Sequence, residues 1–250
     1  MSAPSGEDIL LGEDIAVTFE GLQAIAGVTL SITREAIHGL IGPNGAGKTT
    51  FINVLTGFQV PTLGSVILNG ENLTGKMPEV FAKKGIARTF QNVRLYRGLT
   101  IGENLEINAI ASGCTMRRSR ELARELLEWI GLSRRYHERA DVLPYGEERR
   151  VGIVRALAGA PRFLLMDEPA AGMTEHECET LVSLIREIPK RFGCGILLIE
   201  HNMRVVMDSC SQIYVIDFGR KIAEGAPLEI QNNNDVRNAY LGWDHHHGTP

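Results

Sequence analysis

The chain of 250 residues is 44% hydrophobic and 22% charged, which are ordinary values for a folded domain with a buried core. Its net charge of -4 excludes a general attraction to nucleic acid or anionic lipid, so any such contact would have to be local. The 4 cysteines are scattered without C-x-x-C spacing, which favours free thiols over a zinc site or a disulfide framework. No apolar run approaches the ~18–20 residues that a membrane span needs, and the polar residues 1–8 do not look like a secretory signal. We therefore expect a cytosolic protein whose membrane role, if it has one, comes through a partner.

Alternating apolar and polar residues predict strands at 15–19, 28–32 and 64–68, and the Asn69-Gly70 pair after the third strand is a turn signal. The apolar segment 37–41 predicts a buried strand, and residues 50–55 predict the start of a helix. From residue 36 onward helical and strand patterns alternate, which predicts a mostly parallel sheet covered by helices.

Residues 42–49 read Gly-Pro-Asn-Gly-Ala-Gly-Lys-Thr and match the phosphate-binding pattern G-x-x-x-x-G-K-[ST] between a strand and a helix. The three glycines permit the positive φ angles of a tight turn, so that successive N–H groups converge on phosphate oxygens at a helix N-terminus. Lys48 can reach the β- and γ-phosphates, and the Thr49 hydroxyl can bind Mg²⁺. A glycine-rich turn with a chance lysine is the alternative, which the strand-then-helix context disfavours. The nucleotide contacts predicted for this loop are Gly42, Pro43, Asn44, Gly45, Ala46, Gly47, Lys48, Thr49 and Thr50.

Residues 93–158 carry no strand pattern and predict a helical subdomain inserted into the α/β core. Within it, residues 117–130 are charged and amphipathic, with Leu122, Leu126, Leu127 and Ile130 at helical spacing. Their charges mix Arg with Glu, as on a solvated helix face.

The segment 162–167 predicts the next buried strand, which delivers Asp167 and then Glu168 to the edge of the sheet that holds ligands in open α/β folds. Asp167 would hold Mg²⁺ through its water shell, and Glu168 would act as general base on the attacking water. A strand that ends in two solvated acids is the alternative, but the phosphate loop upstream favours catalysis. The later patterns predict a helix at 175–187 stopped near Pro189, strands at 195–199 and 212–216, a turn at 218–219, a short helix at 235–241, and a polar tail in which His245–His247 is solvated rather than metal-binding.

The order of these motifs resembles that of the ATP-binding-cassette ATPases over residues 9–242. Gln91, in the run Arg88-Thr-Phe-Gln91, matches the family's glutamine loop, which is expected to touch Mg²⁺ and the attacking water. His201 matches the switch histidine that bonds the γ-phosphate. Phe19 stands where an aromatic residue stacks on adenine, with packing in the core as the alternative. The resemblance thus implies ATP and Mg²⁺ as ligands, with catalytic residues Glu168, His201 and Gln91 and metal ligands Thr49, Gln91 and Asp167.

The run Leu143-Pro-Tyr-Gly-Glu-Glu-Arg-Arg150 stands in the place of the family's signature sequence. The resemblance implies that Tyr145, Gly146 and Glu147 present helix-start N–H groups to the nucleotide of an opposite subunit, so that hydrolysis requires a dimer. Two positions depart from the family. Pro144 replaces the usual serine and offers neither hydroxyl nor N–H, and Thr174 stands where an aspartate is usually credited with coupling across the dimer.

The fold that the resemblance implies is α/β: a P-loop NTPase core, in which helices flank a mostly parallel sheet, with an N-terminal antiparallel β subdomain and an inserted α-helical subdomain. Residues 9–242 would form a single ATP-binding-cassette domain. Its nucleotide-binding core and β subdomain would lie in 9–92 and 159–242, its helical subdomain with the signature sequence in 93–158, and a polar tail would follow in 243–250.

Several runs narrow the resemblance to the ATPase subunits of branched-chain amino-acid importers, namely residues 87–96, 103–105, 143–150, 169–172 and 239–242. Such a subunit would lie on the cytoplasmic face of the inner membrane and would pair with a sister ATPase or with a second copy of itself. It would drive integral-membrane permease subunits, with no direct contact to the solute or to nucleic acid. Val93–Tyr96 would line the groove that receives the permease, or would pack in the core; the residues leave both alternatives open.

Three other functions deserve comparison. The ATPase of a lipid or lipopolysaccharide exporter has a similar length and ending, but generally keeps the serine in its signature sequence. Soluble relatives that act on nucleic acid or ribosomes usually carry coiled-coil insertions, zinc fingers or two cassettes, and this sequence has one cassette and no basic tract. A nucleotide-binding regulator without catalysis is disfavoured because Glu168 is present.

Overall fold

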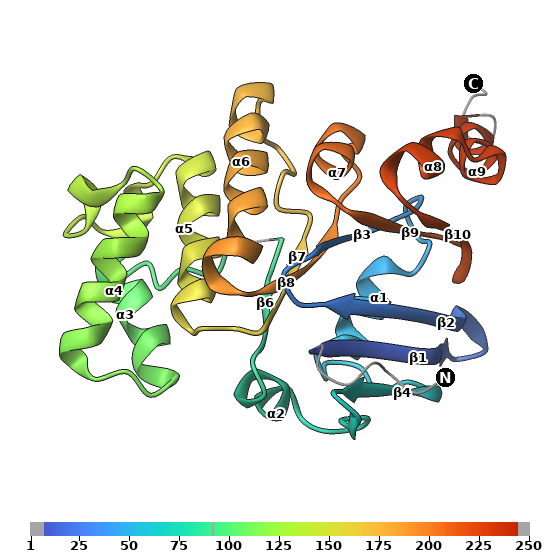
Figure 1. The fold of residues 1–250 in the computed structure, drawn as a ribbon, viewed down its shortest axis with the longest axis horizontal. Coiled ribbons are helices and arrows are strands. Elements are labelled where there is room, and N and C mark those ends of the chain that lie inside the picture. Colours follow the sequence, from blue (N-terminus) through green and yellow to red (C-terminus); the bar gives the residue numbers. More distant parts are fainter. Residues whose placement is uncertain (1–7, 92, 245–250) are drawn as a thin grey trace.

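The computed structural model describes residues 8–91 and 93–244, with the backbone alone for residues 241–244. Two sheets organise this part of the chain (Figure 1), one with the strand order β2-β1-β4-β5 and the other with the order β10-β9-β3-β8-β7-β6. The first sheet consists of β1 (Ile9–Phe19), β2 (Leu22–Thr33), β4 (Leu63–Leu68) and β5 (Glu71–Asn72). The second consists of β3 (Ile37–Ile41), β6 (Ile86–Thr89), β7 (Phe163–Asp167), β8 (Gly195–Ile199), β9 (Gln212–Asp217) and β10 (Arg220–Gly225).

Strand direction separates the two sheets as expected from the sequence. In the first sheet β1 pairs antiparallel with β2 and β4. In the second, β3, β6, β7, β8 and β9 pair in parallel, and the hairpin strand β10 joins β9 antiparallel. The N-terminal antiparallel subdomain and the mostly parallel core are therefore confirmed.

Nine helices lie in the described residues. In sequence order they are α1 (Lys48–Leu55), α2 (Pro78–Lys83), α3 (Ile101–Ala111), α4 (Met116–Trp129), α5 (Tyr145–Ala158), α6 (Glu175–Phe192), α7 (Met203–Ser209), α8 (Pro227–Asn232) and α9 (Asn234–Asp244), with short 3-10 turns at Ser133–Arg135 and Ala140–Val142. Figure 1 shows α5, α6 and α7 on one side of the six-stranded sheet, α3 and α4 farther out beside α5, and α1 between the two sheets.

Two cores lie on opposite faces of the six-stranded sheet. Because successive strand residues point to opposite faces, Leu40 packs with α1 and the four-stranded sheet while its neighbour Ile41 packs with the outer helices. Fully buried Phe51 of α1 belongs to the same cluster as Leu30 of β2 and Leu165 of β7. The helix that follows the phosphate loop is therefore fixed between both sheets.

Residues 93–158 contain helices and 3-10 turns but no strand, apart from an isolated bridge between Thr100 and Arg139. This agrees with the prediction of a helical insertion. The amphipathic helix predicted at 117–130 is α4, and its Leu126 and Leu127 are buried.

Two predicted boundaries are wrong. The helix from residue 175 does not stop near Pro189 but runs to Phe192, where Gly193 adopts a left-handed φ of 58. Proline removes one intrahelical hydrogen bond, but Pro189 lies in the last turn, where buried Ile185 and Ile188 hold the helix against the core. At the C-terminus α9 extends to Asp244, so residues 243 and 244 are helical rather than tail. His245–His247 lies outside the described residues.

The strand predicted at 15–19 is longer than expected, because β1 begins at Ile9. Its pairing with β2 shifts register between Gly12 and Ile15, and Asp14 has a φ of 47. Bulges of this kind interrupt the two-residue periodicity, which is why the alternation identified the second half of the strand alone.

Within the described residues, no helix is both long and apolar enough to cross a membrane.

His38 of β3 makes the stability of this fold sensitive to acid. Its side chain is 4% exposed, and its Nε2 accepts the N–H of Thr33 at 3.1 Å. Burial lowers the pKa of His38 from its usual 6.5 to about 4, although the charge of Glu224 opposes this shift. The unfolded chain therefore takes up a proton first as pH falls, and stability is lost between about pH 6.5 and pH 4, amounting to ~3 kcal/mol for this group.

Urea unfolding at pH 7 and pH 4.5 would measure this contribution. We expect the parent protein to lose ~2–3 kcal/mol more than His38→Gln over that interval, since glutamine takes up no proton. If the free energy of unfolding fell equally in both proteins, His38 would not be the source of the acid sensitivity.

Candidate nucleotide site

The phosphate-binding loop adopts the strained turn that its glycines predict. Gly42, Gly45 and Gly47 have φ angles of 152, 79 and 103. A Cβ on Gly42 would clash with the carbonyl oxygen of Ile216, and one on Gly47 would lie 2.5 Å from the Ile25 side chain. Glycine is therefore required here by backbone conformation and by close packing. The exposed residues of the loop are Asn44, Gly45 and Thr49, and the partly or fully buried ones are Pro43, Ala46, Gly47, Lys48 and Thr50.

Lys48 folds back into the curve of the loop. Its Nζ donates to the carbonyl oxygens of Gly42 at 2.6 Å and Pro43 at 2.9 Å, and the residue is only 6% exposed. Burial lowers the pKa of Lys48, and the charges of Glu168 and Asp167 oppose that shift. The loop thus encloses one ammonium group against its own backbone.

The three predicted catalytic residues come from separate segments and meet at a single oxygen atom. Gln91 follows β6, and its Nε2 donates to Oε2 of Glu168 at 3.0 Å. Nδ1 of His201, which follows β8, lies 3.8 Å from that same oxygen. The His201 side chain is 56% exposed and the Glu168 side chain 21%. A polar cluster of this kind can bind and orient a water molecule beside the phosphate loop.

Glu168 itself has an unusual backbone. Its φ is 47, which is uncommon for a residue with a Cβ, and its N–H donates to the carbonyl oxygen of Ile199 in β8 at 2.9 Å. Such strain concentrates at functional sites. At the end of β7 the two neighbouring acids have different partners, Gln91 and His201 for Glu168 and an arginine for Asp167.

The three candidate metal ligands, Thr49, Gln91 and Asp167, each offer an oxygen donor that suits Mg²⁺. Thr49 is exposed in the first turn of α1, and the Asp167 carboxylate lies at the end of β7. No group of three or more His, Cys, Asp or Glu residues within the described residues could hold a metal. These few ligands fit an ion that relies on nucleotide phosphates and water for most of its coordination, as Mg²⁺ does.

Asp167 is paired with Arg88 of β6, so it is not one of the solvated acids of the alternative interpretation. Arg88 Nη2 lies 2.7 Å from Oδ2 of Asp167, and both side chains are about nine-tenths buried. The run Arg88-Thr-Phe-Gln91 does not by itself indicate a role for Arg88. The strand pairing supplies the missing signal, because β6 and β7 are adjacent and place Thr89 opposite Met166.

Glu200 is a second residue whose role the sequence pattern does not indicate. It is fully buried, and its carboxylate accepts the N–H of Ala170 at 2.6 Å and those of His201 and Asn202 at 3.2 and 3.4 Å. Burial raises the pKa of Glu200, and these hydrogen bonds oppose that shift. The carboxylate therefore joins the loop after Glu168 to the loop that carries His201.

The signature sequence forms the N-terminus of α5. Pro144 is the N-cap, so the first N–H groups of the helix belong to Tyr145, Gly146 and Glu147, which lack intrahelical acceptors by helix geometry. Tyr145 is 46% exposed, and its hydroxyl donates to the Ala171 carbonyl oxygen at 2.6 Å. No hydrogen bond within the described residues joins these three residues to the phosphate loop of the same chain.

Thr174 caps the next helix instead of reaching outward. Its hydroxyl accepts the N–H of Glu177 at 3.4 Å, and the Glu177 carboxylate accepts the N–H of Thr174 at 2.8 Å. This reciprocal capping box fixes the start of α6. Aspartate is also a favoured N-cap residue. Thr174 therefore caps α6 in the way that an aspartate at this position could.

Phe19 does not pack in the core. It is 44% exposed at the end of β1, and its partner Leu22 begins β2. The same β2 strand contacts the phosphate loop, since a Cβ on Gly47 would lie 2.6 Å from the carbonyl oxygen of Ala24. An exposed aromatic ring at this hairpin is available for stacking on a base.

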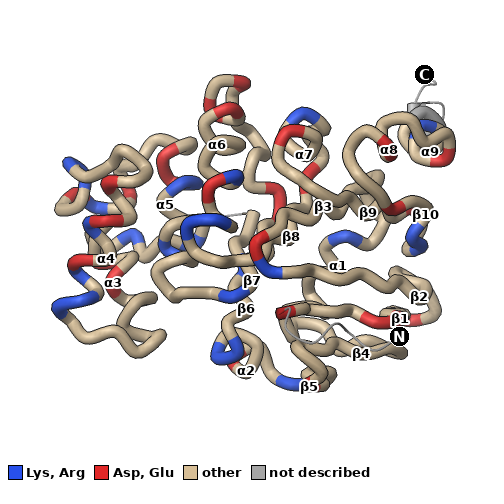
Figure 2. The backbone as a smooth tube through the Cα atoms, viewed as in Figure 1, with Lys and Arg blue, Asp and Glu red and all other residues tan. Residues whose placement is uncertain are grey.

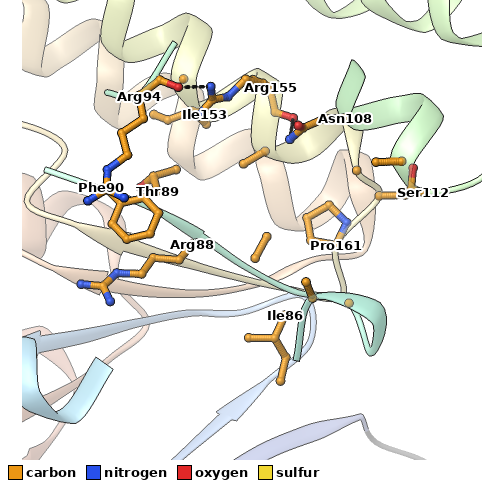
Figure 3. Close-up of a pocket in the computed structure, with 18 of the residues that line it drawn as sticks. Ile86, Arg88, Thr89, Phe90, Arg94, Asn108, Ser112, Ile153, Arg155 and Pro161 are labelled. Carbon is orange, nitrogen blue, oxygen red and sulfur yellow. Dashed lines mark hydrogen bonds between the residues drawn. The ribbon is translucent and has the colours of Figure 1, made fainter. Parts of the chain in front are cut away.

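A cavity of about 790 Å³ lies between the six-stranded sheet and the helical insertion. Figure 3 shows its walls, which come from α2, β6, α3 and α5. Val93 and Arg94 line it, Leu95 is buried in the core, and Tyr96 is 51% exposed. Within the segment 93–96, two residues thus line a cavity and one packs in the core.

Comparisons with known proteins give consistent results. A family model described as "ABC transporter" matches residues 25–171, and one described as "Branched-chain amino acid ATP-binding cassette transporter" matches residues 220–246. The chain is 40% identical to the high-affinity branched-chain amino acid transport ATP-binding protein LivG of Escherichia coli K12, covering 94% of this chain and 98% of LivG. It is 34% identical to the lipopolysaccharide export system ATP-binding protein LptB of Haemophilus influenzae, covering 94% and 97%. Among solved structures it is similar to the ADP conformation of MJ1267, an ATP-binding cassette of an ABC transporter, with a TM-score of 0.85, 32% identity, and coverage of 94% and 99%.

Proposed function

The chain belongs to the ABC transporter family of ATP-binding cassettes, and on that premise we propose that it is the ATP-hydrolysing subunit of an importer for branched-chain or related amino acids. The proposal that the chain hydrolyses ATP rests on one observation: Gln91 and His201 both approach the same carboxylate oxygen of Glu168. The arrangement supplies a base, two orienting groups and a phosphate-binding loop, which together suffice for attack of water on a γ-phosphate.

In the proposed reaction, Lys48 exchanges its bonds to the loop carbonyl groups for bonds to phosphate oxygens. Glu168 accepts a proton from the attacking water, Gln91 orients that water, and the exposed His201 imidazole reaches the γ-phosphate. Phe19 stacks on adenine. Charge that develops on the phosphate is then met by the ammonium group of Lys48 and by the N–H groups of the loop.

Mg²⁺ would be held by the Thr49 hydroxyl, by Asp167 through water and by the amide oxygen of Gln91, and when bound it would neutralise charge on the phosphates. Gln91 now donates its amide to Glu168. Its oxygen is the end that would face a cation, so the residue can serve both groups at once.

We propose a dimer as the active form, in which each α5 N-terminus faces the nucleotide held by the other subunit. Support comes from the exposed position of Tyr145 and from the N–H groups of the first turn, which form a site for anions. The partner is a sister ATPase or a second copy of this chain. ATP closes the dimer because it binds the closed state more tightly than the open one.

The cavity of Figure 3 is the proposed docking groove for an integral-membrane permease subunit. It combines the apolar side chains of Phe90, Val93 and Ile153 with basic side chains, three of which (Lys84, Arg88 and Arg162) are paired with carboxylates outside the lining. Its basic residues are Lys83, Lys84, Arg88, Arg94, Arg149, Arg155 and Arg162, and its described lining includes no Asp or Glu. Such a surface suits a short permease segment that carries carboxylates. The chain would then lie on the cytoplasmic face of the inner membrane, without touching the transported solute.

The amino-acid class of the solute is supported by the match of residues 220–246 to a branched-chain family model and by the higher identity to LivG than to LptB. The exporter alternative also lacks support from the signature sequence, in which Pro144 replaces serine. Nucleic acid is a poor fit as a partner, because the net charge is -4 and the charged helix α4 mixes acidic with basic residues (Figure 2).

The switch role of His201 predicts a moderate kinetic effect. His201→Ala removes one hydrogen bond to a charged phosphate, so we expect turnover to fall ~10-fold or more while the affinity for ATP changes by less than about threefold. Steady-state hydrolysis and fluorescent-nucleotide binding on the same preparation would measure both. Turnover equal to that of the parent would remove His201 from the reaction.

Purification of the tagged chain from native membranes in mild detergent tests the assembly. Mass spectrometry should identify polytopic permease subunits, together with a sister ATPase if the dimer is mixed. Glu168→Gln, with ATP added, should recover the same partners. Recovery of ribosomes, nucleic acid or soluble proteins alone would contradict the transporter assignment.

A further inference from the structure

The guanidinium group of Arg88 contacts both the phosphate site and the wall of the cavity. On the side of the phosphate site, Nη2 donates to Asp167 at 2.7 Å and Nη1 donates to Oδ1 of Asn53 in α1 at 2.6 Å. The Arg88 side chain is 8% exposed. One guanidinium group thus bridges the helix after the phosphate loop and the strand that carries the candidate metal ligand.

The same guanidinium group also lies over two aromatic rings, those of Phe90, which lines the cavity, and of Phe58. Its Cζ is 4.9 Å from the centroid of Phe90 and 6.0 Å from that of Phe58. The two rings meet edge to face with centroids 5.9 Å apart, and Arg94 lies over Phe90 at 4.3 Å. Figure 3 shows the Phe90 ring between the side chains of Arg88 and Arg94, at the wall of the cavity.

We propose that Arg88 is a positioning residue that competes with Mg²⁺ for Asp167, and that Phe90 transmits the state of the cavity to this ion pair. The proposal rests on the proposed function, since it takes Asp167 as a metal ligand and the cavity as the permease groove. A guanidinium group remains charged at every physiological pH. Held 2.7 Å from a buried carboxylate, it cancels much of the negative charge that would attract a divalent cation.

The geometry also predicts the direction of the coupling. Phe90 and Phe58 hold the guanidinium plane by packing and by cation–π attraction. If a partner segment displaces Phe90, Arg88 loses part of this support and its hold on Asp167 weakens. Occupation of the groove would then strengthen metal binding at the nucleotide, before any hydrolysis takes place.

The test is the binding of Mn²⁺, a paramagnetic substitute for Mg²⁺, to the full chain in the presence of a non-hydrolysable ATP analogue, followed by electron paramagnetic resonance. Arg88→Gln should lower the Kd for Mn²⁺ about tenfold, because it removes the competing charge. Arg88→Lys keeps the charge and should stay within about threefold of the parent. Arg191→Gln is the matched control: it removes an arginine that also lies over aromatic rings, those of Trp129 and Phe192, and it should change nothing.

Phe90→Leu is the second variant, to be used if Arg88→Gln fails to fold. It keeps both charges of the Arg88–Asp167 ion pair, so no buried charge loses its partner. It should lower the Kd for Mn²⁺ about two- to threefold in the parent and leave it unchanged in an Arg88→Gln background. Unchanged or weaker Mn²⁺ binding in folded Arg88→Gln, or no effect of Phe90→Leu, would overturn the proposal. Analogue binding in the same samples separates the two hypotheses: an analogue that binds without recruiting Mn²⁺ to the parent would overturn the assignment of the metal site itself.

Discussion

Replacement of Glu168 by glutamine is expected to slow ATP hydrolysis ~10²–10⁴-fold, the range for loss of a general base. Glutamine has nearly the same shape and can still bond to Gln91, but it cannot accept the proton of the attacking water. Because no hydrogen bond among the described residues joins Glu168 to the phosphate loop, the affinity for ATP should be retained. The variant should therefore accumulate as an ATP-bound dimer, a species that turnover keeps rare in the parent.

Single-turnover hydrolysis and size-exclusion chromatography with ATP would measure both effects. Glu175→Gln is a suitable control, because this carboxylate is 78% exposed at the start of α6 and pairs with Arg204. It should leave the rate within about twofold of the parent, as expected for a surface ion pair. Brisk hydrolysis by Glu168→Gln would remove Glu168 from the role of base.

Replacement of Lys48 by alanine is expected to weaken ATP binding ~10–100-fold and to abolish measurable turnover. The loss corresponds to ~1.5–3 kcal/mol, the usual worth of a hydrogen bond to a charged group. Lys48 is enclosed by the loop, where its Nζ donates to Gly42 and Pro43. It is also the one basic residue in the sequence of residues 42–50, so no other side chain of the loop can replace its charge. The backbone N–H groups would remain and account for the residual affinity.

Calorimetric titration with ATP would measure the affinity directly. Lys190→Ala, which removes an exposed lysine of α6, should bind ATP like the parent. An unchanged affinity in Lys48→Ala would contradict the assignment of residues 42–49 as the phosphate site.

Features that depend on local chemistry were predictable from the sequence. The positive φ angles of Gly42, Gly45 and Gly47 follow from a pattern in which each glycine has a steric reason. The strand at 37–41 and the acids after β7 follow from short apolar runs between breakers. The sequence of each of these elements is enough to predict it, because residues close together in the chain determine its conformation.

Features that depend on distant contacts were not predictable in the same way. The ion pair of Arg88 with Asp167 requires β6 to lie beside β7, and the two residues are 79 positions apart. Glu200 connects two loops only after β7 and β8 pair. Pro189 lies within α6 because tertiary packing outweighs the loss of one helical hydrogen bond. In each case the deciding interaction joins segments that the linear pattern does not relate.

Uptake by reconstituted vesicles tests the central claim most directly. The complex isolated through this chain would be placed in liposomes with ATP inside, and its solute-binding protein would be added outside with labelled leucine, isoleucine or valine. We expect ATP-dependent accumulation of at least one of these amino acids, and none with a complex that carries Glu168→Gln. Hydrolysis of ATP without uptake of any of the three, or uptake that persists in the Glu168→Gln complex, would contradict the proposed function.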